Sequence, residues 1–176
     1  TLNNVAEALL RVGRLGDATT IVDDGIDRAV EAYGEDDRTT LFLRYTKAKI
    51  ERAAGRHDAA EAQLIASLAA HRRVHGVLAL DAYHVYETLI LFYLDTRPDP
   101  AAALTASRAM LADLEALGRE HDYNLMGRTL EMRALLALER YDEAESSLRA
   151  YRDVAPEKHH QSIDARLDEV ARARRP

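Results

Sequence analysis

Residues 13–34 read GRLGDATTIVDDGIDRAVEAYG, and residues 55–76 read GRHDAAEAQLIASLAAHRRVHG. The second stretch begins 42 residues after the first, and both run from a Gly-Arg pair to a closing glycine with alanine at the sixth position. Between the glycines, apolar residues recur three or four positions apart, which is the spacing of a helix with one buried face. The two stretches therefore predict one helix that occurs twice, at the same place in a repeating unit.

Two independent series of residues extend this period along the chain. Small residues stand near the start of the second helix of each unit, where they allow close helix packing. Glycines stand where a helix is expected to end in a left-handed cap. The first series is Ala18, Ala60, Ala102 and Ala144, and the second is Gly34, Gly76 and Gly118. The next position in the glycine series is His160, so the fourth unit ends differently.

Apolar spacing and turn residues predict helices along the whole chain and no strand. The expected helices cover about residues 1–13, 17–33, 38–54, 58–75, 79–95, 99–117, 122–138 and 142–154. They pair into four hairpin repeats, at about 1–34, 35–76, 77–118 and 119–156, and a further helix at about 160–173 has the single apolar stripe of a capping helix. The sequence thus predicts an all-α fold, a right-handed α-α superhelix or solenoid, in a single domain over residues 1–176.

Composition limits the classes of function. Hydrophobic residues make up 47% of the chain and charged residues 31%, which is a globular balance. The net charge of −6 and the lack of a concentrated basic face predict no nucleic-acid partner. The absence of cysteine excludes disulfides and thiolate catalysis, and no apolar run predicts a membrane span. Because the chain is helical from Thr1 and shows no signal peptide, we expect a fragment of a larger protein, cytoplasmic by default.

The repeat motifs resemble tetratricopeptide repeats, in the 42-residue variant typified by kinesin light chains. The resemblance rests on the opening Leu2-Asn3-Asn4-Val5-Ala6, on Gly13, Leu15, Ala18, Val22 and Gly25, and on Glu139, Tyr141, Ala144 and Leu148. Two positions depart at the turn-glycine slot, Arg97 and Glu139, and Glu51 stands where a large apolar residue is usual. The resemblance implies a scaffold that binds other proteins. Bacterial repeats of this type often stand beside a kinase, ATPase or regulator domain.

Histidine pairs are the nearest approach to a catalytic or metal-binding motif. His71 and His75 have a spacing that can hold a metal ion, but no matching carboxylate is near, so we expect half-exposed imidazoles at a helix end. His57-Asp58 and His121-Asp122 match the His-Asp pair of helical phosphohydrolases, yet both stand at helix starts, where Asp serves as a cap. No nucleophile or phosphate-loop motif occurs. We predict no catalytic residue, no metal, no cofactor and no enzyme activity.

In tetratricopeptide arrays the first helix of each repeat lines a concave groove, and the inward positions here follow from that resemblance. Lys49, Arg52 and Arg133 are candidates to bind a carboxylate or an acidic stretch, with apolar anchors between them. The predicted lining is Asn3, Glu7, Phe42, Tyr45, Lys49, Arg52, His84, Glu87, Leu91, Met126, Thr129 and Arg133. We predict that this groove binds a peptide segment of a partner protein.

Two other functions stay open at this point. The repeats are also compatible with a regulatory segment that senses a peptide or small ligand for an attached kinase, ATPase or transcription regulator. Alternatively, the aromatic residues Tyr83, Tyr86, Phe92 and Tyr93 concentrate in one helix, and any of them that is exposed would form a face for a homodimer or another partner.

Overall fold

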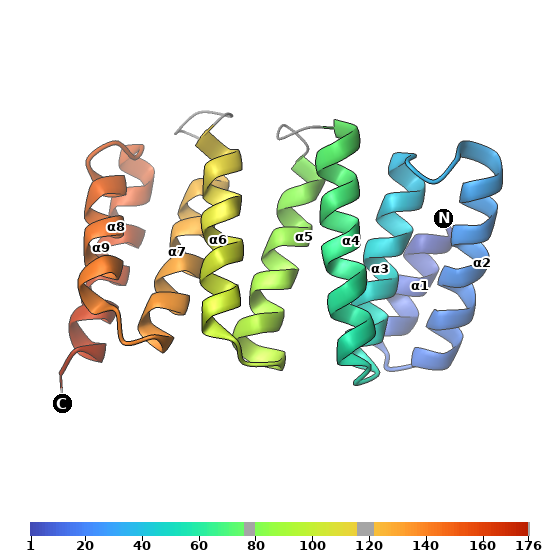
Figure 1. Cartoon of the computed structure of the whole chain (residues 1–176), viewed down its shortest axis with the longest axis horizontal. Helices are drawn as coiled ribbons and strands as arrows, with labels where there is room; N and C mark the ends of the chain where they lie inside the picture. Colours follow the sequence, from blue (N-terminus) through green and yellow to red (C-terminus); the bar gives the residue numbers. More distant parts are fainter. Residues whose placement is uncertain (76–79, 116–121, 176) are drawn as a thin grey trace. The chain divides into compact units, whose positions relative to one another are not determined.

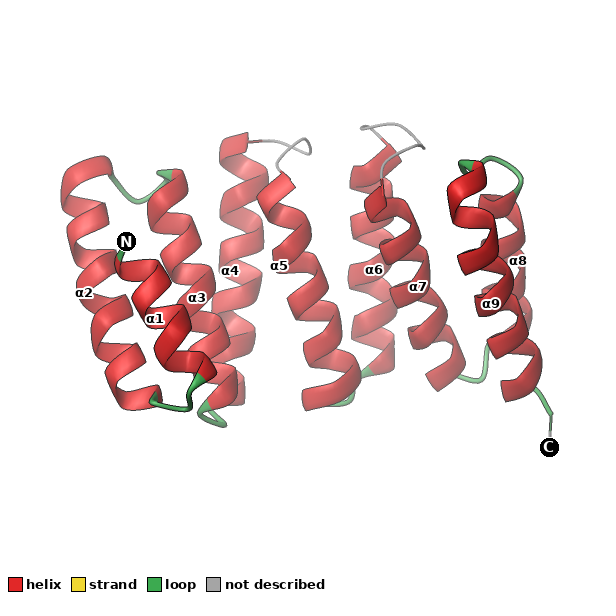
Figure 2. Cartoon of the chain, turned by 180° about the vertical axis from the view of Figure 1, so that it is seen from behind, coloured by secondary structure: helices red, strands yellow, loops and turns green. Residues whose placement is uncertain are grey.

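The computed structural model describes residues 1–75, 80–115 and 122–175, and those residues form helices joined by short turns (Figure 1). No strand occurs among them (Figure 2), which confirms the all-α fold. The chain divides into two compact units, Thr1–Gly76 and Val77–Pro176. The division falls between the second and third predicted repeats, and a single domain over the whole chain stays a prediction.

Unit 1 consists of two helix hairpins. Its helices are α1 (Leu2–Arg11), α2 (Leu15–Tyr33), α3 (Arg38–Ala53) and α4 (His57–His75). The third of these, α3, packs against α1, α2 and α4, so it forms the centre of the unit. Ala18 is fully buried, as its place in the alanine series predicts. Gly25 allows a still closer approach, because a Cβ there would lie 3.1 Å from Cδ2 of Leu43.

The helices of unit 1 end and begin where the turn residues indicate. Gly13, Gly34 and Gly55 all adopt positive φ, at 76°, 93° and 74°. Gly34 ends α2 with a ψ of 170°, so it is an extended glycine and not the predicted left-handed cap. Asp37 caps α3 by accepting a hydrogen bond from the Thr39 amide at 2.7 Å. Asp58 is not a cap, because α4 begins at His57 and places this carboxylate inside its first turn, where the helix dipole favours negative charge.

Unit 2 contains two hairpins and the capping helix. Its elements are α5 (Leu80–Leu91), the π-helical segment η2 (Phe92–Thr96), α6 (Pro100–Glu115), α7 (Asp122–Ala137), α8 (Tyr141–Arg152) and α9 (Glu157–Ala173). The last helix, α9, packs on α7 and α8. Two residues of its apolar stripe, Ile163 and Val170, are buried and Leu167 between them is half-buried, as expected for a capping helix.

The two turns that lack glycine differ from each other. Glu139 keeps the glycine conformation, with a φ of 58°. Arg97 does not, with a φ of −130°, and the chain instead widens into the π-helical segment, whose Phe92 carbonyl accepts a hydrogen bond from the Arg97 amide at 2.9 Å. The prediction of a regular helix as far as residue 95 is therefore wrong. Pro100 begins α6, within one residue of the predicted start at about residue 99, and the Asp99 carboxylate caps it through the Ala102 amide at 2.9 Å.

Burial explains one departure from the repeat pattern and corrects two expectations. Glu51 is buried at a position where the repeat pattern usually has an apolar residue, and its carboxylate forms an ion pair with Arg56. His71 is buried rather than half-exposed, and its Nδ1 lies 2.8 Å from the Ser67 carbonyl one turn earlier. All four aromatic residues predicted as a possible partner face are buried, namely Tyr83, Tyr86, Phe92 and Tyr93. Gly76, Gly118, His121 and the side chains of His75 and Asp122 lie outside the described residues.

Candidate peptide-binding faces

The predicted lining of unit 1 lies on the adjacent helices α1 and α3. Glu7 and Lys49 are 42 residues apart, so they occupy the same position in consecutive repeats. Asn3 and Tyr45 form a second such pair. Because α1 packs beside α3 (Figure 2), equivalent positions of the two repeats become neighbours on one face. The structure therefore brings these four predicted residues together.

Polar contacts tie α1 to α3 on this face. Lys49 donates from Nζ to Oε1 of Glu7 at 2.5 Å. The Thr46 hydroxyl donates to Oδ1 of Asn3 at 2.8 Å and lies 3.4 Å from Glu7 Oε1. The sequence analysis did not select Thr46. Its position next to the predicted lining residue Tyr45 could have indicated it. Because Lys49 and Glu7 neutralise each other, Lys49 is not a spare cation for a partner's carboxylate.

Aromatic rings and one arginine complete the face. The Lys49 ammonium lies 5.3 Å from the Tyr45 ring centroid, and the Phe42 and Tyr45 centroids are 6.2 Å apart. Phe42 is 38% exposed, which is unusual for so large an apolar side chain. Arg52 lies on the same side of α3 and forms no ion pair with another described residue. Unit 1 thus presents an apolar anchor and a guanidinium on either side of a neutralised pair.

In unit 2 the predicted residues meet through side chains that the sequence analysis did not select. Arg133 on α7 donates to the Asp95 carboxylate at 2.6 Å, so this cation is also paired within the chain. The His84 ring on α5 meets Tyr123 edge-on, and its Nε2 lies 3.2 Å from the Tyr123 hydroxyl. Asp95 and Tyr123 each lie about one helical turn from a predicted lining position. That spacing could have predicted that their side chains lie on the same face.

For the remaining predicted residues of unit 2, the described hydrogen bonds and ion pairs lie within a single helix. Glu87 lies on α5 with its carboxylate 4.0 Å from Nδ1 of His84. Thr129 donates its hydroxyl to the Leu125 carbonyl of its own helix at 2.8 Å. Leu91 and Met126 are half-buried. The face in unit 2 is therefore less organised than the face in unit 1.

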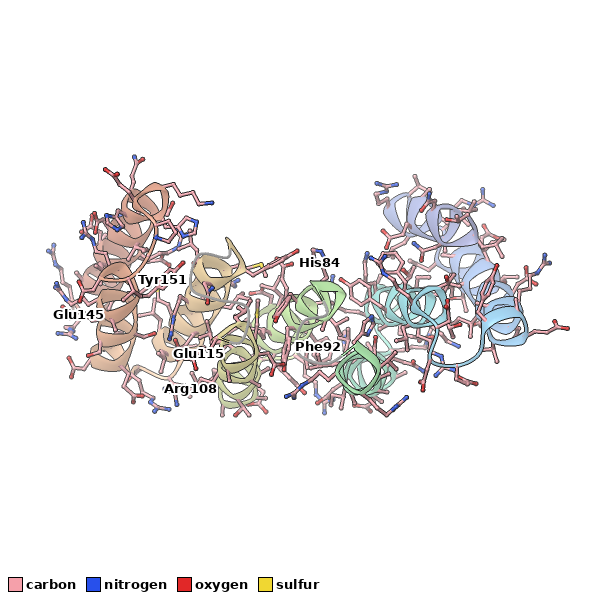
Figure 3. All side chains as sticks on the ribbon, turned by 90° about the horizontal axis from the view of Figure 1, so that it is seen from above. His84, Phe92, Arg108, Glu115, Glu145 and Tyr151 are labelled. Carbon is pink, nitrogen blue, oxygen red and sulfur yellow. The ribbon has the colours of Figure 1, made fainter. Side chains whose placement is uncertain are left out.

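A second polar cluster in unit 2 is structural. Glu131 is buried, and its carboxylate accepts hydrogen bonds from Arg108 at 3.2 Å, Arg128 at 3.1 Å and Ser147 at 2.6 Å, which links α6, α7 and α8. Figure 3 shows Arg108 and His84 on opposite sides of the unit, so this cluster is not part of the His84 face. Hydrogen bonds from Arg140 and Arg108 lower the pKa of Glu143 next to it, so that carboxylate stays charged.

Within residues 1–75, 80–115 and 122–175, no three His, Asp or Glu side chains converge as metal ligands would. The helices described in that part of the chain are all too short or too polar to cross a bilayer. The described faces offer hydrogen bonds, ion pairs and apolar contact.

Comparison with known proteins agrees with this architecture. Residues 46–81 match the family model of the tetratricopeptide repeat. The fold is similar to crystal structures of nearly identical TPR-like repeats assigned to a kinesin light chain of Podosopora anserina. For both the original protein and a single-substitution variant, the TM-score is 0.78 at 15% identity, with 98% of this chain and 84% of that chain covered. No curated protein matches the sequence significantly.

Proposed function

We propose that the chain is a non-enzymatic tetratricopeptide repeat scaffold that binds a peptide segment of a partner protein, because residues 46–81 match the tetratricopeptide repeat model and the fold is similar to that of TPR-like repeats. Tetratricopeptide repeats are generally protein–protein interaction modules, and the face of α1 and α3 in unit 1 is the surface that best supports this role here. The observation that carries the proposal is an exposed Phe42 ring near the start of α3 and an Arg52 guanidinium near its end, on a face where Glu7 and Lys49 are paired with each other.

The arrangement suits a partner that brings an apolar side chain and a hydrogen-bond acceptor. Phe42 offers a ring that becomes buried on binding, which is the usual property of an interface anchor. Arg52 offers planar donors to a carboxylate or a backbone carbonyl. The Glu7–Lys49 pair and the Asn3–Thr46 hydrogen bond hold α1 and α3 in place. Because the surface is already formed, less conformational entropy is lost when a flexible peptide binds it.

Single-residue variants test this face without breaking internal pairs. Arg52→Glu and Phe42→Ala change groups that protrude, whereas reversing Lys49 or Arg133 would also leave Glu7 or Asp95 without its cation. Matched controls in unit 1 are Arg11→Glu, an exposed arginine on α1, and Ile65→Ala, an exposed apolar residue on α4.

Each variant is immobilised and incubated with lysate of the source organism, and retained proteins are identified by mass spectrometry. The expected result is a protein retained by the wild type and both controls but lost from Arg52→Glu and Phe42→Ala. Peptides of that protein are then titrated by fluorescence anisotropy, where each face variant should weaken binding about tenfold, equivalent to roughly 1.4 kcal/mol. Equal retention by all five baits would contradict the proposal.

A further inference from the structure

The helix α4 presents an apolar surface on the side that is turned away from the core of unit 1. It packs on α3, and the residues of its inner side are buried and recur three or four positions apart, namely Ala60, Leu64, Ser67 and His71. At about 100° per residue, the positions opposite them are Ala62, Ile65, Ala66 and Ala69, and all four are exposed. Ile65 is 49% exposed and Leu68 at the edge is half-buried, so this surface has a branched apolar side chain at its centre.

The equivalent helices of other repeats are polar at the same four positions. By the 42-residue period, these positions are occupied in α2 by Thr20, Asp23, Asp24 and Asp27, and in α8 by Ser146, Arg149, Ala150 and Asp153. Single exposed apolar residues are common on protein surfaces. Four neighbouring apolar positions, where the equivalent helices carry charge, indicate an interface instead.

The two ends of this surface carry opposite charges. Asp58 lies at the start of α4, and Arg72 and Arg73 lie near its end, all of them exposed. Asp58 and Arg73 are equally distant from the midpoint between Ile65 and Ala66, at roughly 11 Å on either side along the helix. A second copy of α4 that runs in the opposite direction therefore brings an arginine to each aspartate.

We propose that α4 is a dimerisation helix, which pairs with α4 of a second copy of the chain in an antiparallel arrangement about a two-fold axis between Ile65 and Ala66. Ala62 then faces Ala69 of the second copy, and each contact occurs twice because both copies use the same surface. Ala62, Ile65 and Ala69 have the three-and-four spacing of a two-stranded coiled coil. The alanines allow the two backbones to approach closely, so that Ile65 becomes buried between them.

This surface is separate from the two faces considered above. The aromatic residues predicted as a dimer face are buried, and the surface of α4 contains neither Phe42 nor Arg52. Ile65→Ala should therefore weaken the dimer while it retains the peptide partner, so the two proposals fail independently. Arg73 also forms an ion pair with Asp36, but both side chains are exposed and water screens that pair. A guanidinium has several donors, so a carboxylate of the second copy can share it.

Analytical ultracentrifugation of the chain tests the dimer. Because one pair of helices makes a small interface, we expect a weak dimer, which is measured at concentrations from about 5 µM to about 0.5 mM. Ile65→Asp places two carboxylates beside the axis and should raise the dissociation constant at least about tenfold. Val154→Asp, at a valine that is 44% exposed, is the matched control and should leave it unchanged. Absence of a dimer, or a dimer that Ile65→Asp leaves intact, overturns the proposal.

Exchange of the end charges tests the antiparallel arrangement. Asp58→Arg brings arginines of the two copies together and Arg73→Asp brings aspartates together, so each should raise the dissociation constant about threefold to tenfold. The double variant restores opposite charges and should return the constant to within about twofold of the wild-type value. Within one helix the two positions are roughly 22 Å apart, so only contacts between copies can produce this recovery. A double variant that dimerises as weakly as the single ones overturns the arrangement, provided that circular dichroism shows all three to be folded.

The absence of cysteine from the sequence allows a direct test of the register. Ala62→Cys and Ala69→Cys, mixed and mildly oxidised, should form a disulfide-linked dimer because the two positions face each other. Each variant alone should stay largely unlinked, since its cysteines would lie roughly 10 Å apart along the paired helices, too far for a disulfide. Equal linking in all three samples overturns the register. If the wild type is a monomer at every concentration and Ile65→Asp instead loses a protein from the lysate, a partner protein occupies this surface and the proposed dimer is overturned.

Discussion

Within the described residues, the turns that join the two helices of a hairpin have a residue with positive φ in three cases, and that residue is glycine in two of them. Gly13 and Gly55 adopt φ values of 76° and 74°, and Glu139 adopts 58° at the equivalent turn of the fourth repeat. A side chain in this conformation brings Cβ close to the following carbonyl oxygen, at a cost of about 1–2 kcal/mol. The turn geometry is therefore imposed by the packing of α7 on α8 and not by the preference of Glu139.

Replacing Glu139 with glycine should relieve this cost. Glycine has more conformational entropy in the unfolded chain, which offsets part of this relief, so we expect Glu139→Gly to raise the free energy of unfolding by only about 0.5–1 kcal/mol. Gly13→Ala is the matched opposite and should lower it by about 1 kcal/mol, since no atom lies within 4 Å of the new Cβ and only the backbone is strained. Urea denaturation measures both, and a Glu139→Gly variant that is less stable than the wild type would contradict the explanation.

Tyr83 should make the protein sensitive to alkali. Burial first, and then the charge of Asp113, raise the pKa of Tyr83 from 10.0 to about 12. Because the folded pKa lies above the unfolded value, this contribution to stability is complete below pH 10 and is lost as the pH rises through about 12.

The free energy of unfolding, measured across that pH range, should fall less steeply in Tyr83→Phe than in the wild type. Tyr33→Phe, at an exposed tyrosine, is the control and should follow the wild-type curve. Identical curves for all three proteins would show that Tyr83 is not the titrating group.

At the scale of helices and turns, local sequence signals were sufficient where the structure depends on neighbours in the chain. Asp37 caps α3, and Pro100 begins α6, because capping and proline chemistry involve only the adjacent turn. The end of α5 was not predictable in this way. Arg97 carries no signal for a π-helical segment, and the widened turn depends on how Phe92 and Tyr93 are buried in unit 2.

Close packing of α6 and α7 depends on the lack of a side chain at Gly127. A Cβ there would lie 2.8 Å from Cδ2 and 3.3 Å from Cγ of Leu111, which is itself buried. Gly127→Ala should therefore lower the free energy of unfolding by about 1 kcal/mol, because moving Leu111 costs more than the gain in helix propensity.

Gly16→Ala on α2 is the control for this change. No atom lies within 4 Å of its Cβ, so helix propensity alone acts and should raise stability by about 0.5–1 kcal/mol. Thermal denaturation followed by circular dichroism shows whether each substitution raises or lowers stability. A stabilising Gly127→Ala would show that Leu111 moves at no cost.

At the scale of the whole molecule, the repeat period predicted which residues share a face but not which of them are available to a partner. The lining positions follow from the resemblance, since the period places Glu7 beside Lys49. Lys49 pairs with Glu7 and Arg133 pairs with Asp95, and the partners are 42 and 38 residues apart in the sequence. These pairs depend on side-chain geometry between different helical segments, which the repeat period does not give. Two of the three cations predicted to bind a partner are therefore held within the chain, and Arg52 is the remaining candidate.

The division into two compact units predicts that stabilising changes in different units are independent. Gly16→Ala lies in unit 1 and Glu139→Gly in unit 2. The double variant should change the free energy of unfolding by the sum of the two single effects, within about 0.5 kcal/mol. Urea denaturation of the wild type, the two single variants and the double variant measures this double-mutant cycle. An interaction energy above about 1 kcal/mol would mean that the two sites are energetically coupled.

The ion pair between Glu7 and Lys49 has a consequence for how such a chain can lengthen. A tandem duplication of residues 35–76 would insert a second lysine at the position that follows Lys49 in the series, so two ammonium groups would face each other where the first hairpin has opposite charges. A longer array therefore needs a compensating acidic substitution before it is as stable as the present one.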